Sequence, residues 1–126
     1  MKFRTLIHVN EMARWNVALG SIDNFLNAVD SNEIDIVVLA NGEAVKEYLV
    51  CRDGLHAKDR FCRETTGPIS MMTSLNQKGV SFLACRNALA AHGINAKDLA
   101  EFVIVVPAGM VVLVELQSKG FAYIKP

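Results

Sequence analysis

The sequence has few cysteines and no excess of charge. Three of its 126 residues are cysteine, and no two of them form a C-x-x-C pair, which argues against a disulfide framework or a cysteine-based zinc site. Thirteen basic residues balance thirteen acidic residues, and no Lys/Arg-rich run is present, so the footprint of a nucleic-acid-binding or membrane-binding segment is missing. We therefore expect reduced thiols, no nucleic-acid partner and no membrane partner.

Long hydrophobic runs are also missing. The longest apolar stretch, residues 103–116, is interrupted by Pro107 and Gly109 and is too short to cross a bilayer. The first fifteen residues lack the apolar core and cleavage site of a signal peptide. We expect a soluble, cytoplasmic protein, and the length, without repeats or linkers, predicts a single domain over residues 1–126.

The residues that are present form apolar runs separated by amphipathic segments. Strands are expected at residues 3–9, 34–40, 80–84 and 102–106 and in the closing "FAYIKP". Helices are expected at residues 15–29, 44–49, 68–77 and 110–119, with a short one from Arg86. Strands that are almost continuously apolar and alternate with helices pair in parallel and carry helices on both faces. The predicted fold class is therefore α/β, a three-layer α/β/α domain with flavodoxin-like layering.

In such sheets, ligands bind at the carboxyl ends of the strands. These ends are residues 8–11, 41–43, 85–87 and 107–109. The segment after the first strand has no glycine, which excludes a dinucleotide fingerprint and a P-loop. A magnesium-binding receiver domain is disfavoured, because the first strand ends in His8 and Asn10 and the third in Cys85 rather than in carboxylates. A nucleophile elbow is disfavoured because "ACRNA" lacks the flanking glycines. One unusual feature remains, the thiol of Cys85.

The chain resembles the DsrE/DsrF-like sulfur-relay proteins, and most closely their stand-alone, single-chain branch. The resemblance covers most of the chain and rests on five segments in order: "HVNEMARW", "VVLANGEAV", "QKGVSFLACRNALAAHGI", "VVPAGMVVLVELQSKG" and "FAYIKP". It implies a five-stranded, mainly parallel sheet in three layers. That agrees with the fold class predicted from the pattern of strands and helices.

The resemblance implies that Cys85 carries sulfur as a persulfide, since relay members have such a cysteine where the third strand passes into the next helix. Sulfur transfer needs a thiolate, and helix N-termini stabilise thiolates; Arg86 would add positive charge. Cys85 is alternatively a small packed residue, because free cysteine is often buried. Two function classes stay open: a sulfur carrier or thiol-based sulfurtransferase, and a non-enzymatic, homo-oligomeric binding or interaction module.

Other strand-end residues could line a pocket with the thiol. His8 could polarise or deprotonate a group there, or be a structural histidine. Asn10 and Asn41 could bind a ligand, or cap a helix and form the Asn-Gly turn respectively. The pocket candidates are His8, Asn10, Asn41, Gly42, Arg86 and Asn87.

The charged segment of residues 52–67 is long for a loop in a compact domain. Such a loop is either a lid over a site or a solvated connection, and with few apolar anchors it is expected to be the most mobile segment. Cys51, His56 and Cys62 lie in or beside it at irregular spacing. We therefore expect no metal, and no cofactor is indicated.

The segment "MVVLVEL", residues 110–116, would be apolar almost all round if helical. A helix that covers a sheet needs one apolar stripe, so its second face is expected to be buried between subunits. The resemblance implies a trimer or hexamer. It also implies a protein sulfur donor or acceptor as a further partner.

Overall fold

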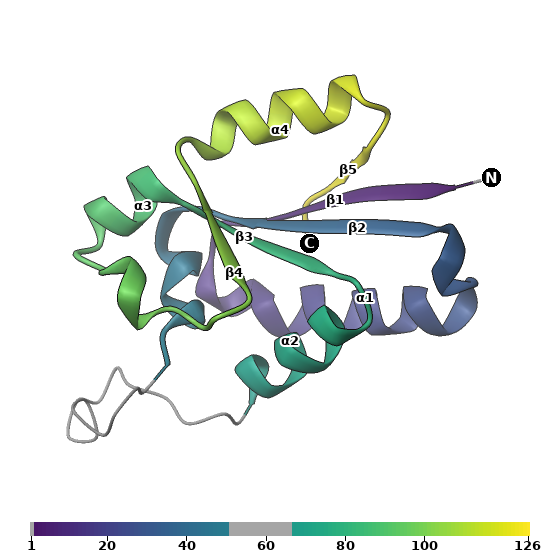
Figure 1. Cartoon of the computed structure of the whole chain (residues 1–126), viewed down its shortest axis with the longest axis horizontal. Helices are drawn as coiled ribbons and strands as arrows, with labels where there is room; N and C mark the ends of the chain where they lie inside the picture. The colour runs from purple at the N-terminus through teal and green to yellow at the C-terminus, as the bar shows by residue number, and fades with distance from the viewer. Residues whose placement is uncertain (1, 51–66) are drawn as a thin grey trace.

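The computed structural model describes residues 2–50 and 67–126 (Figure 1). The predicted segment 52–67 therefore lies outside the described residues except for Gly67, which directly precedes a helix. Short 3-10 turns join the main elements: η1 (Met12–Arg14), η2 (Ser31–Glu33), η3 (Gly42–Tyr48) and η4 (Ala96–Asp98). The strands are β1 (Phe3–Val9), β2 (Ile34–Ala40), β3 (Ser81–Cys85), β4 (Val103–Val106) and β5 (Ala122–Ile124). The helices are α1 (Trp15–Ala28), α2 (Pro68–Gln77), α3 (Arg86–Ala91) and α4 (Gly109–Ser118).

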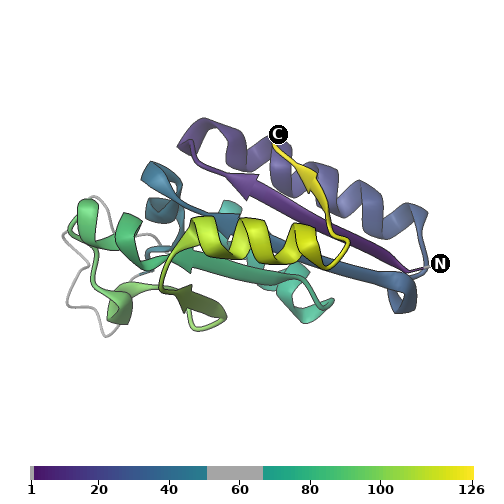
Figure 2. The ribbon, with the colours of Figure 1, turned by 90° about the horizontal axis from the view of Figure 1, so that it is seen from above.

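The five strands form one sheet in the order β4-β3-β2-β1-β5, and every neighbouring pair is parallel. Helices α1 and α2 lie on one face of the sheet, and α4 lies on the other (Figures 1 and 2). This arrangement confirms the predicted α/β fold with helices on both sides of a five-stranded parallel sheet. Parallel pairing requires the crossovers to carry helices over the sheet.

The larger hydrophobic core lies between the sheet and the pair α1 and α2. Alternate strand residues such as Val38 and Phe82 face helix residues such as Leu19 and Met72. Trp15 and Tyr48 stack edge to face in this core, with ring centroids 5.4 Å apart. Both polar groups are satisfied, because the Trp15 indole N–H donates to the Ala44 carbonyl at 3.0 Å and the Tyr48 hydroxyl to the Leu83 carbonyl at 3.0 Å. Burial raises the pKa of Tyr48 well above its usual value.

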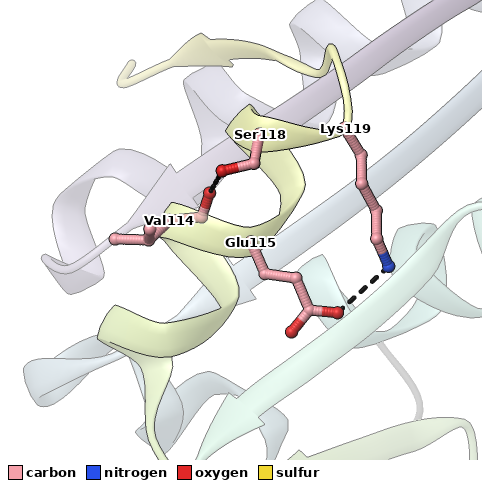
Figure 3. A network of polar contacts seen from close by, with 4 residues as sticks. All are labelled: Val114, Glu115, Ser118 and Lys119. Carbon is pink, nitrogen blue, oxygen red and sulfur yellow. Dashed lines mark hydrogen bonds and ion pairs between the residues drawn. The ribbon is translucent and has the colours of Figure 1, made fainter.

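The second core is smaller and lies under α4. Leu6 and Leu39 from the sheet meet Leu113 of α4, and α4 packs mainly on β1 and β2. Polar contacts run along α4, including a 3.0 Å ion pair between Glu115 and Lys119, the residue that follows the helix (Figure 3). Met110, Val111 and Val114 are nevertheless exposed on this helix. The prediction of a helix that is apolar almost all round is therefore confirmed.

Most bounds of the strands and helices lie within two residues of the bounds predicted from the sequence, with two informative differences. The third strand runs one residue further than predicted, so that Cys85 is its last residue. The prediction that Asn10 caps the first helix is wrong. A 3-10 turn begins there instead, with Glu11 at its N-cap position, and α1 starts only at Trp15. The Met12 backbone N–H is satisfied by the Glu43 carboxylate at 3.1 Å rather than by a capping side chain nearby in sequence.

None of the helices in the described part of the chain is long and apolar enough to cross a membrane.

Candidate functional site

The carboxyl ends of the parallel strands meet at one edge of the sheet, where α3 begins and α4 starts (left in Figure 1). The loops after β1 and β2 touch there. A Cβ on Gly42 would lie 3.1 Å from the Asn10 carbonyl oxygen, and Gly42 has a φ of +56°. This close approach and the left-handed backbone both require glycine, as the Asn-Gly turn predicts.

Cys85 lies at the junction of β3 and α3. It is the last strand residue and the N-cap of α3, and its side chain is 7% exposed. The sulfur makes no capping hydrogen bond to α3. Its donor is the backbone N–H of Gly109, whose nitrogen is 3.3 Å from Sγ. The helix N-terminus that contacts the thiol is thus that of α4, and not that of the helix following Cys85 in sequence.

Gly109 is the first residue of the ten-residue helix α4. A Cβ at this position would lie 3.4 Å from the Cys85 Cβ and 3.3 Å from Cδ2 of Leu39. The absence of a side chain therefore lets the start of α4 sit directly against the sulfur. The unpaired N–H groups at a helix start carry partial positive charge, which makes this a favourable position for an anionic sulfur.

His8 lies near the end of β1 and is held by two side chains. Nδ1 is 2.6 Å from the Tyr123 hydroxyl, and Nε2 is 2.9 Å from Oδ1 of Asn41. Since an amide oxygen only accepts, Nε2 donates to Asn41, and in the neutral ring Nδ1 accepts the Tyr123 O–H. Both ring nitrogens form hydrogen bonds within this cluster, to Tyr123 and Asn41, whereas the hydrogen bond to the Cys85 sulfur comes from Gly109.

The other predicted site residues lie around the same edge. Asn41 joins the histidine cluster, and Asn10 and Gly42 form the contact between the first two loops. Arg86 and Asn87 are the first two residues of α3 and are exposed. The structure thus brings together His8 with Asn41 and Asn10 with Gly42, while Cys85 pairs with a residue outside the predicted set.

Sequence reasoning missed Tyr123 as a site residue. It nominated the strand end of residues 107–109 but did not include Gly109 among the pocket candidates. Tyr123 reaches His8 because β5 pairs with β1, with Leu6 opposite Tyr123. Gly109 had a usable signal, since it begins an apolar helix directly after a strand end. Its contact with Cys85 nevertheless depends on β3 and β4 being neighbours.

A groove of about 270 Å³ runs between α4 and the β3–β4 side of the sheet. Its walls are mostly apolar, and they come from Val37, Ser81, Leu83, Ile104, Val112, Glu115 and Leu116. Within residues 2–50 and 67–126, no three His, Cys, Asp or Glu side chains gather as metal ligands would. Cys51, His56 and Cys62 lie outside the described residues.

Comparisons with known proteins add two kinds of finding. A model of the DsrE/DsrF-like family matches residues 4–126, whereas no curated protein gave a significant match. Among solved structures, the chain is similar to MTH1491, a protein of unknown function from Methanobacterium thermoautotrophicum, with 27% identity and a TM-score of 0.78 over 99% of this chain and 100% of that one. It is also similar in fold to the ychN protein from E. coli, with 17% identity and a TM-score of 0.75 over the whole of both chains.

Proposed function

Because the chain belongs to the DsrE/DsrF-like family, we propose that it is a sulfur carrier or thiol-based sulfurtransferase in which Cys85 bears a persulfide. The observation that carries the proposal is the hydrogen bond from the Gly109 N–H to the Cys85 sulfur. It supplies a donor at a helix start to the atom that must become anionic to react. We place this chemistry in the cytoplasm, where reducing conditions keep thiols free.

In the proposed loading step, the Cys85 thiolate attacks the outer sulfur of a donor persulfide. A bond forms between Sγ and that sulfur, the donor's S–S bond breaks, and the electron pair leaves on the donor thiolate. The exchange needs no oxidant or reductant. The donor and the acceptor are persulfide-bearing and thiol-bearing groups of proteins or small molecules.

Intact-mass spectrometry after incubation with inorganic polysulfide tests the proposal. One added sulfur is expected on the wild-type chain and on a Cys51→Ser/Cys62→Ser double variant, which serves as the matched control. The Cys85→Ser variant should take up none. Equal loading of the Cys85→Ser variant, or an unloaded wild-type chain, would contradict the assignment of Cys85.

A second candidate function, a homo-oligomeric interaction module, is favoured by the exposed apolar side of α4. Met110, Val111 and Val114 are 69%, 59% and 60% exposed. A patch of this kind on a helix that already packs on its own sheet is typical of a protein interface. We propose that it is covered by further copies of the chain, in a trimer or hexamer.

Sedimentation velocity at micromolar concentration tests the assembly. A species larger than the 13.8 kDa chain is expected, and Val114→Glu should shift it toward monomer because a charge would be buried in the interface. Ser70→Glu, which puts the same charge at an exposed position of α2 on the other face of the sheet, is the matched control. A clean monomer in the wild-type chain would remove this candidate.

A further inference from the structure

The hydrogen bond at Cys85 is made where the start of α4 lies directly against the sulfur. The Gly109 nitrogen lies 3.3 Å from Sγ, and a Cβ on Gly109 would lie 3.5 Å from the same sulfur and 3.3 Å from Leu39. The contact joins residues 24 positions apart and is buried. It fixes a donor on the inner sulfur, the atom directly bonded to the Cys85 side chain.

We propose that the Gly109 N–H favours release of sulfur from Cys85, an inference that rests on the proposed function. In a deprotonated persulfide the negative charge is on the outer sulfur, and Sγ is neutral. During delivery an acceptor nucleophile attacks the outer sulfur and bonds to it. The bond between the outer sulfur and Sγ breaks, and its electron pair stays on Sγ as a thiolate.

The effect of the donor follows from where the charge goes. An N–H group binds an anionic acceptor more strongly than a neutral one, so Gly109 stabilises the thiolate that leaves and the transition state in which its charge develops. It gives little to the loaded persulfide, whose charge is one atom further away. The site is therefore built to discharge sulfur to a nucleophilic acceptor rather than to store it.

Two variants test the donor at this position. Replacing Gly109 by glycolic acid turns the amide between residues 108 and 109 into an ester, which removes the N–H and adds no atom next to the sulfur that lies 3.3 Å from the nitrogen. Gly109→Ala keeps the N–H and is the control for a change at this residue. Proline is unsuitable, because its ring would occupy the place of the hydrogen that points at the sulfur.

Both variants are made in the Cys51→Ser/Cys62→Ser background, so that Cys85 is the one remaining cysteine. A pyridyl disulfide is formed on Cys85 and displaced by hydrosulfide, which installs the persulfide without a physiological donor. Cyanide then attacks the outer sulfur, forming thiocyanate and the Cys85 thiolate. Thiocyanate release is followed in time, and thermal unfolding of each variant is measured beside it.

The ester variant should release thiocyanate about tenfold more slowly than the alanine variant and the background protein, since it lacks one hydrogen-bond donor to the leaving sulfur. Equal rates would overturn the inference. A persulfide that forms by this chemical route but not from polysulfide would overturn the proposed function alone. Failure of the chemical route on the folded background protein would overturn both.

A measurement without any change at Gly109 covers the case in which the ester variant does not fold. In the background protein at an alkaline pH, at which an ordinary cysteine is ionised, the Gly109 amide proton is expected to move upfield in the NMR spectrum when the persulfide is installed, because its acceptor Sγ then carries no negative charge. An unchanged amide resonance would overturn the inference.

Discussion

The free energies of unfolding of the Cys85→Ser and Cys85→Ala variants test whether the hydrogen bond from the Gly109 N–H to the Cys85 sulfur contributes to stability, or whether the sulfur only packs in the core. In the wild-type chain the Gly109 nitrogen is 3.3 Å from the Cys85 sulfur. Serine keeps a hydrogen-bond acceptor near this N–H, but its C–O bond is shorter than the C–S bond of cysteine and its hydroxyl is more polar than a thiol. We expect a loss of about 1 kcal/mol in the free energy of unfolding. Alanine leaves the buried Gly109 N–H without an acceptor, which costs about 1–3 kcal/mol in addition to the lost packing of the sulfur.

The expected order of stability is therefore wild type, Cys85→Ser, then Cys85→Ala. For a chain of 126 residues, 1 kcal/mol corresponds to roughly 3–5 °C in Tm. Urea unfolding, with equal slopes in the three proteins, measures the difference directly. If alanine is as stable as serine or more stable, the Gly109 donor contributes nothing, because an inert packed site accepts alanine better than a buried hydroxyl.

Three further predictions concern the framework around the site. Burial raises the pKa of Tyr48 above the ordinary value of 10.0. The contribution of the neutral Tyr48 to the free energy of unfolding is therefore complete below pH 10 and decreases as the pH rises above 10. In urea titrations at alkaline pH, the free energy of unfolding should fall less steeply with pH for Tyr48→Phe than for the wild-type chain. Tyr123→Phe removes the hydroxyl that His8 accepts and should lower the free energy of unfolding by about 1 kcal/mol, and an unchanged urea midpoint would count against this bond. Gly42→Ala, at a φ of +56°, should cost about 1–3 kcal/mol, whereas Gly20→Ala in open space within α1 should stabilise by about 0.5–1 kcal/mol; thermal unfolding of the pair checks both signs.

Local sequence patterns were sufficient for the elements and for the position of the thiol. The runs that became β1 and β2 are mostly apolar, as is typical of buried parallel strands, with Arg4 and Asp35 near their starts. Pro68 marks the first turn of α2. Cys85 could be placed at a strand end because the change from strand to helix period occurs at that residue.

The partners of the site residues could not be predicted, because they depend on strand order. Cys85 is 24 residues from Gly109, and His8 is 115 residues from Tyr123. No local periodicity encodes that β4 lies beside β3, or that β5 lies beside β1. The misplaced cap at Asn10 has a similar cause, since the group that satisfies the first turn comes from the loop after the second strand.

The place of β5 beside β1 also governs how the chain folds as it is made. Thr5 pairs with Ala122, so the outer edge of β1 stays open during synthesis until the final strand emerges. Contacts between residues so distant in sequence form slowly, and an open strand edge can pair with another chain in the meantime. Nascent chains that stop before Tyr123 lack both this cover and the hydroxyl bound to His8, and aggregation through the β1 edge is the hazard they carry.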